Sequence, residues 1–233
     1  MEGTRSGLPL LAASARPRAG VLLIGCAVLV AVLGAVFAGQ NTADRFDHAV
    51  DAPVITSFAS HHGLALWLAF PGTTKPAIAL SLVIAAACLL AGRLAGRLAG
   101  ALLTVAAVPV AVGLCELLIK PLVHRTYIGQ VVYPSGHVAA ISALAATVTV
   151  LLLAAPRPVL ARPLRVFVLI LAYLTVAAVV VGVIAVRFHY FTDTVAGVAV
   201  GTGTVCGLAL ILDAVQPGSA VARWMAPVTK RTR

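Results

Sequence analysis

Two short polar stretches between apolar runs hold the side chains most able to do chemistry. The first, residues 120–137, reads KPLVHRTYIGQVVYPSGH, and the second, residues 187–193, reads RFHYFTD. Ionisable groups held close to membrane depth are costly and tend to be functional. The stretches offer cations, histidines, a carboxylate, a hydroxyl and a Ser-Gly backbone, and the candidates are Lys120, Arg125, Ser135, Gly136, His137, Arg187, His189 and Asp193.

The cations and the Ser-Gly pair indicate phosphate binding. Three cations that converge on one point suit a tetrahedral dianion, and arginines add bidentate contacts to its oxygens. These cations are Lys120, Arg125 and Arg187. Ser135 and Gly136 stand where an apolar run begins, and free backbone N–H groups at a helix N-terminus bind anions. We therefore expect all five residues to bind phosphate.

The histidines and the carboxylate indicate nucleophilic catalysis. His189 and Asp193 are four residues apart, so they share one face of a helical turn. The carboxylate can hold one ring nitrogen and leave the other aimed at phosphorus, as in catalytic triads. His137 is then free to protonate the leaving oxygen. Simpler interpretations stay open: half a metal site for His189 and Asp193, arginines that only snorkel, and a Lys120 that pairs with Glu116 on a helix.

The composition of the whole chain identifies an integral membrane protein. Of its 233 residues, 61% are hydrophobic and only 10% are charged, whereas soluble domains are about half apolar and about a quarter charged. This length suits one membrane domain. The net charge of +10 is better explained by basic cytoplasmic loops than by nucleic acid, which we do not expect as a partner. Abundant alanine and glycine, with arginine in excess of lysine, point to a bacterial source.

Six apolar runs predict an all-α bundle of six transmembrane helices. The first run could instead be a cleaved signal peptide, but its length favours a retained span. We expect a disordered cytoplasmic tail over residues 1–19, a membrane domain over 20–215 and a basic cytoplasmic tail over 216–233. Between the first two spans, a polar loop would contain a short helix that starts near Asp51. The predicted spans are residues 20–39, 76–92, 98–119, 138–155, 166–186 and 194–212.

The distribution of basic residues predicts the orientation of the bundle. With a cytoplasmic N-terminus, the inside segments hold twelve of the 17 lysines and arginines, and the outside segments hold five. Because basic residues gather in cytoplasmic loops, both termini should be cytoplasmic. Both polar stretches would then face the periplasm or the cell exterior, in a multi-pass protein of the cell membrane. Small residues in the sixth span, at Gly197, Gly201, Gly203 and Gly207, would let helices approach closely, within one chain or in a homo-oligomer.

The motifs resemble those of the type 2 phosphatidic acid phosphatase family, the membrane branch of the lipid phosphatase and vanadium haloperoxidase superfamily. That family has the signatures K-x6-R-P, P-S-G-H and S-R-x5-H-x3-D. Residues 134–137, PSGH, match the second signature in full, and residues 189–193 match the end of the third. In order and topology the resemblance extends over about residues 76–212.

The resemblance implies a role for each matching residue. His189 would be the nucleophile that forms a phosphohistidine, Asp193 would orient it, and His137 would protonate the leaving group. The phosphate oxygens would be bound by Lys120, Ser135 and Gly136. The family needs no metal or other cofactor. Its members mostly dephosphorylate lipid phosphates or isoprenyl diphosphates from a six-helix fold, so we expect a metal-independent phosphatase that takes such a substrate from among the membrane lipids.

Two arginines depart from the family pattern. Arg125 follows Lys120 by five residues rather than seven, and the arginine of the third signature would fall at Val183. We expect Arg125 and Arg187 to supply these guanidinium groups from shifted positions. The departures leave other functions open: a phosphotransferase or haloperoxidase on the same scaffold, or a non-catalytic protein that binds or moves an anionic lipid.

Overall fold

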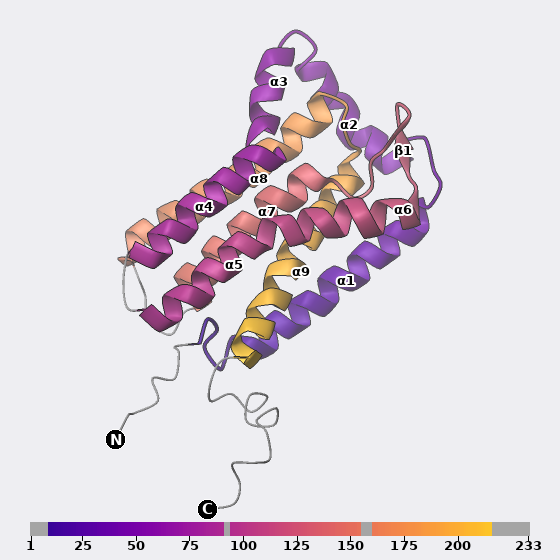
Figure 1. Ribbon diagram of the computed structural model, residues 1–233. Helices are drawn as coiled ribbons and strands as arrows, with labels where there is room; N and C mark the ends of the chain where they lie inside the picture. Colours follow the sequence, from indigo (N-terminus) through magenta and orange to yellow (C-terminus); the bar gives the residue numbers. More distant parts are fainter. Residues whose placement is uncertain (1–8, 91–93, 155–159, 216–233) are drawn as a thin grey trace, which may run out of the picture.

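The computed structural model describes residues 9–90, 94–154 and 160–215, which form a bundle of long helices with short elements at one end (Figure 1). η1 is a 3-10 helix, and η2 and η3 are π-helical segments that continue α5 and α7. The elements are α1 (Arg16–Phe37), α2 (Arg45–Ser57), α3 (His62–Ala69), η1 (Phe70–Gly72), α4 (Thr74–Leu90), α5 (Leu94–Gly113), η2 (Leu114–Ile119), α6 (Lys120–Val123), β1 (Thr126–Tyr127), β2 (Gln130–Val131), α7 (Gly136–Thr149), η3 (Val150–Ala154), α8 (Arg162–Ala185) and α9 (Phe191–Val215).

Five of these helices are long and apolar enough to cross a membrane. They are α1, the continuous rod from Leu98 to Val123, α7 with its π-helical extension, α8 and α9. A sixth crossing results if α3 with η1 and α4, which meet at 47°, are counted together. The prediction of an all-α membrane bundle is therefore confirmed, with five or six crossings in the described part of the chain.

The chain before α1 folds back onto the end of α9. The Asp213 carboxylate accepts hydrogen bonds from the N–H groups of Leu10, at 2.6 Å, and Leu11, at 3.1 Å, and forms an ion pair with Arg16 at 3.3 Å. Both leucines are buried. The expectation of disorder over residues 1–19 is therefore wrong from Pro9 onward, while residues 1–8 and the predicted tail at 216–233 lie outside the described residues. These contacts place the start of α1 and the end of α9 at the same end of the bundle.

α7 is the central helix, with 72% of its span buried. It packs between α5, α8 and α9. A Cβ added at Gly197 would lie 2.6 Å from the Ser135 carbonyl oxygen, and one at Gly203 would lie 3.1 Å from Cys26 Cβ on α1. The predicted close approach of small residues on α9 is thus observed within one chain, on two faces of the same helix.

The opposite end of the bundle carries α2, α3 and the β1–β2 hairpin, and we call it the hairpin end (Figure 1). α2 begins at Arg45 because the Asp44 side chain caps it, accepting from Asp47 N–H at 2.6 Å. The expected start near Asp51 is wrong, since Asp51 lies in the second turn and Pro53 lies inside the helix.

The hairpin closes the polar stretch between α6 and α7. Thr126 pairs with Val131, and Tyr127 pairs with Gln130. Its two turn residues both have positive φ, with 75° at Gly129; a turn of this hand matches the twist of the strands. The hairpin returns the chain to the start of α7, where the predicted site residues begin.

Candidate active site

The first turn of α7 carries three predicted site residues, and α9 fixes its position. Ser135 is the N-cap, and its Oγ accepts from Val138 N–H at 3.4 Å. The N–H of Ser135 itself donates to the Asp193 carbonyl at 3.0 Å. The absence of a side chain at Gly197 lets α9 lie against this turn. The starts of α7 and α9 are therefore adjacent, which brings His137 to the second polar stretch.

His189 and Asp193 flank the start of α9. Asp193 Oδ2 lies 3.9 Å from His189 Nδ1, which is within ion-pair range and too long for a hydrogen bond. The same oxygen accepts from Tyr190 N–H at 3.0 Å. His189 Nδ1 has no hydrogen-bond partner among the described residues. Because catalytic hydrogen bonds often tighten only in the substrate complex, this geometry suits a carboxylate that orients the ring.

The two histidine rings come from different elements and lie side by side. The ring centroids of His137 and His189 are 6.1 Å apart at an interplanar angle of 64°. Burial lowers the pKa of His189 to about 3, and the nearby His137 and Lys120 contribute to the shift. The His189 imidazole is therefore neutral at physiological pH and keeps a free lone pair. A neutral ring is the form in which histidine can attack phosphorus.

Lys120 pairs with Glu116, as one of the simpler interpretations anticipated. Its Nζ lies 2.7 Å and 2.9 Å from the two carboxylate oxygens of Glu116. The pair stands next to the start of α7, because a Cβ added at Gly136 would lie 2.8 Å from Glu116 Oε1. Both Lys120 and Glu116 also act electrostatically on His137. The structure thus brings Lys120 to the Ser-Gly turn together with a carboxylate.

Arg125 is fully buried and binds two carboxylates. Its guanidinium donates to Asp193 Oδ1 at 2.7 Å and to Asp47 Oδ2 at 2.5 Å. The guanidinium carbon lies 4.1 Å from the ring centroid of Phe37 and 4.3 Å from that of Tyr190. It also donates to Thr192 Oγ1 at 2.7 Å. Its role as a phosphate ligand stays a prediction, since its partners here are two carboxylates, a hydroxyl and two aromatic rings. The contacts hold Asp193 in place beneath His189.

Asp47 is a member of this network that sequence reasoning missed. Besides Arg125, it accepts from Thr192 N–H at 2.9 Å and from Thr192 Oγ1 at 3.0 Å. One turn later, Asp51 accepts from the Phe191 N–H, and burial together with Asp47 raises the pKa of Asp51 to about 7. Two carboxylates of α2 thus cap the start of α9. Their spacing of four residues in a polar segment was the available signal.

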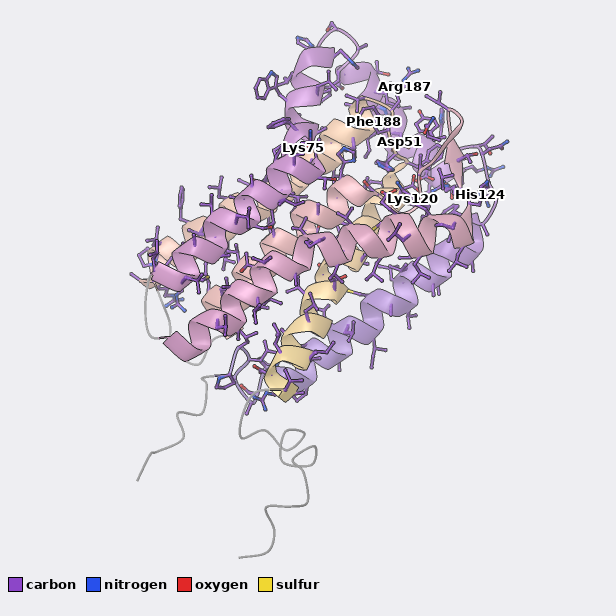
Figure 2. The ribbon with its side chains drawn as sticks, in the orientation of Figure 1. Asp51, Lys75, Lys120, His124, Arg187 and Phe188 are labelled. Carbon is purple, nitrogen blue, oxygen red and sulfur yellow. The ribbon has the colours of Figure 1, made fainter. Side chains whose placement is uncertain are left out.

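Arg187 is separate from the buried network. It is exposed and adopts a left-handed conformation with φ 60° just before His189. In the described part of the chain it makes no ion pair. Figure 2 shows Arg187, Phe188, Lys75 and Lys120 at the hairpin end of the bundle. Its predicted contact with phosphate stays a prediction.

The arrangement combines the parts needed for phosphoryl transfer. It has a neutral imidazole next to a carboxylate, a second imidazole, a lysine and the first turn of a buried helix, with Gly136 and His137 as its first residues. Free N–H groups at such a turn and a nearby ammonium stabilise charge on phosphate oxygens.

Comparison with known families gives one match. Residues 98–216 match a family model described as the PAP2 superfamily. The match spans half of the chain and includes every predicted site residue, whereas Asp47 lies outside it. No curated protein and no solved structure matches the chain.

Proposed function

Because the chain belongs to the PAP2 superfamily, whose members are generally phosphatases, we propose that it is an integral-membrane phosphatase acting on a lipid phosphate or isoprenyl diphosphate through a phosphohistidine at His189. The observation that carries the proposal is the meeting of two distant polar stretches. His137 and His189 have ring centroids 6.1 Å apart, and Asp193 lies 3.9 Å from the His189 ring. The twelve-to-five distribution of basic residues supports an extracytoplasmic site.

The reaction proceeds by double displacement. A lone pair of the neutral His189 ring attacks phosphorus, and the bond from phosphorus to the lipid oxygen breaks. A protonated His137 gives its proton to that oxygen. The lipid alcohol or lipid monophosphate therefore leaves with one negative charge fewer than it would carry without the proton. Water then attacks the phosphohistidine and gives a proton to the now neutral His137, the N–P bond breaks, and inorganic phosphate is released. Asp193 stabilises the positive charge that the His189 ring carries between the two steps.

We assign phosphate binding to Lys120, to the Ser135 hydroxyl and to the backbone N–H of Gly136, because the Ser135 N–H already donates to the Asp193 carbonyl. The support is their position beside both histidines, at the start of the buried helix α7. Arg125 acts instead as a positioning residue, because its fully buried guanidinium holds Asp193. We assign Arg187, which is exposed and two residues before His189 in sequence, as the second cation that contacts the substrate phosphate, from the rim of the site.

A single assay tests this function. The protein is purified in detergent and given a panel of lipid phosphates and an isoprenyl diphosphate, with EDTA present, and released phosphate is measured. We expect release by wild type and none by His189→Ala. Equal release by both would exclude the histidine mechanism, and loss of wild-type activity in EDTA would favour a metal at His189 and Asp193. Transfer of the phosphoryl group to a second lipid, with little free phosphate, would identify a phosphotransferase.

A further inference from the structure

Glu116 is a carboxylate placed at membrane depth that the proposed reaction does not use. It belongs to the membrane-crossing rod that ends at Val123, seven residues or about 10 Å from that end. Its side chain is 44% exposed, and the next residue, Leu117, is 83% exposed. A carboxylate at such a depth is costly to hold and needs a reason.

The position of the Glu116 carboxylate coincides with the place proposed for phosphate. Its two oxygens lie 2.7 Å and 2.9 Å from Lys120 Nζ. Oε1 also stands 2.8 Å from the point where a Cβ on Gly136 would be. The carboxylate is thus an anion that pairs with an ammonium and lies beside the start of a helix, and an ammonium and a helix start are the two features that bind phosphate. We call the space between Lys120 Nζ and Gly136 the phosphate seat.

We propose that Glu116 is an internal competitor for the phosphate seat, so that a substrate phosphate binds by displacing the Glu116 carboxylate and taking Lys120 as its own partner. This inference rests on the proposed function, since it concerns the same seat. No bond is made or broken in the exchange. Lys120 remains paired before and after, and Glu116 moves outward to the side on which its side chain is already partly exposed.

The exchange makes Glu116 a specificity-determining residue. It lowers the affinity of every anion that takes the seat, because each must break the pair with Lys120. The surrounding membrane is rich in phosphodiester headgroups, whose phosphates carry one negative charge. A terminal phosphate carries about −1.5 to −2 at neutral pH and attracts Lys120 more strongly. The competitor therefore excludes weakly bound diesters while terminal phosphates still bind.

The test measures phosphate binding without turnover. The full chain is purified in nanodiscs, and its melting temperature is followed during titration with inorganic phosphate. We expect Glu116→Gln to bind phosphate about tenfold more tightly than wild type, because glutamine keeps the size of the side chain and removes the charge. Asp44→Asn is the matched control: it removes a carboxylate at the hairpin end, retains an N-cap acceptor for α2, and should bind phosphate as wild type does.

Three results would overturn the inference. Phosphate affinity that is unchanged or weaker in Glu116→Gln would mean that Glu116 positions Lys120 rather than competing with substrate. An equal gain in phosphate affinity in Asp44→Asn would show that removing any carboxylate at the hairpin end strengthens phosphate binding. No phosphate-dependent shift in any variant would mean that no seat exists. Glu116→Ala repeats the measurement if the glutamine variant folds poorly, and the readout stays valid if His189→Ala shows that hydrolysis follows another route.

Discussion

Removing the Arg125 guanidinium should destabilise the protein and impair Asp193 without abolishing phosphate binding. Asp47 and Asp193 are both fully buried and both bind Arg125, at 2.5 Å and 2.7 Å. Arg125→Gln leaves two facing carboxylates without a cation, and breaking a buried pair from one side costs about 3–5 kcal/mol. Arg125→Lys keeps the charge, but one ammonium cannot bind both carboxylates at once as the planar guanidinium does. Each lost charged hydrogen bond costs about 1.5–3 kcal/mol.

The assay combines unfolding with two functional readouts. Denaturant unfolding in detergent gives the loss of stability, the rate of phosphate release gives kcat, and inorganic phosphate titration gives affinity. We expect stability and kcat to fall in the order wild type, Arg125→Lys, Arg125→Gln, while phosphate affinity stays close to wild type in the lysine variant. Arg45→Gln, at the exposed start of α2, is the matched control. A loss of phosphate affinity with stability intact would refute this assignment and identify Arg125 as a phosphate ligand.

Two further outcomes follow from the packing of α9. Gly201→Ala should lower the free energy of unfolding by about 1–3 kcal/mol through overpacking, because the added Cβ would lie 2.8 Å from Ala143 N. Gly25→Ala is the control: its added Cβ meets nothing within 4 Å, so this variant should unfold as wild type does. For Asp51, the pKa of about 7 exceeds that of about 4 in an unfolded chain, so stability falls as pH rises between these values. Asp51→Asn should therefore have a higher melting temperature than wild type at pH 8, and the difference should shrink towards pH 4. An equal difference in melting temperature at pH 8 and pH 4 would contradict this.

The sequence predicted the membrane bundle well because a helix that crosses a membrane has to be apolar along most of its length, and such runs are visible in the sequence. The fourth predicted span, residues 138–155, begins two residues after α7 does. The sequence did not predict the 47° bend between α3 with η1 and α4, at which η1 contacts α7. A Cβ added at Gly72 would lie 2.8 Å from the His137 carbonyl oxygen.

The candidate site was predicted where the spacing alone fixes geometry. His189 lies just before α9 rather than on the expected helical turn, and Asp193 is in the first turn of α9, yet the spacing of four still brings the ring and the carboxylate to 3.9 Å. His137 follows a helix start. Asp47 was missed because it reaches Arg125 across 78 positions of sequence, and no local pattern encodes such a distance. The pairing of Lys120 with Glu116 was foreseen by helical spacing, but its position over Gly136 depends on how α5 and α7 pack.

The central claim is that His189 carries the phosphoryl group during the reaction. The direct measurement is mass spectrometry of enzyme quenched in alkali during turnover of a lipid phosphate, because phosphohistidine survives alkali better than acid. We predict a phosphoryl group on the peptide that contains His189 in wild type and none in His189→Ala. A phosphoryl group on another residue, or turnover with no phosphorylated peptide at all, would contradict the proposed function.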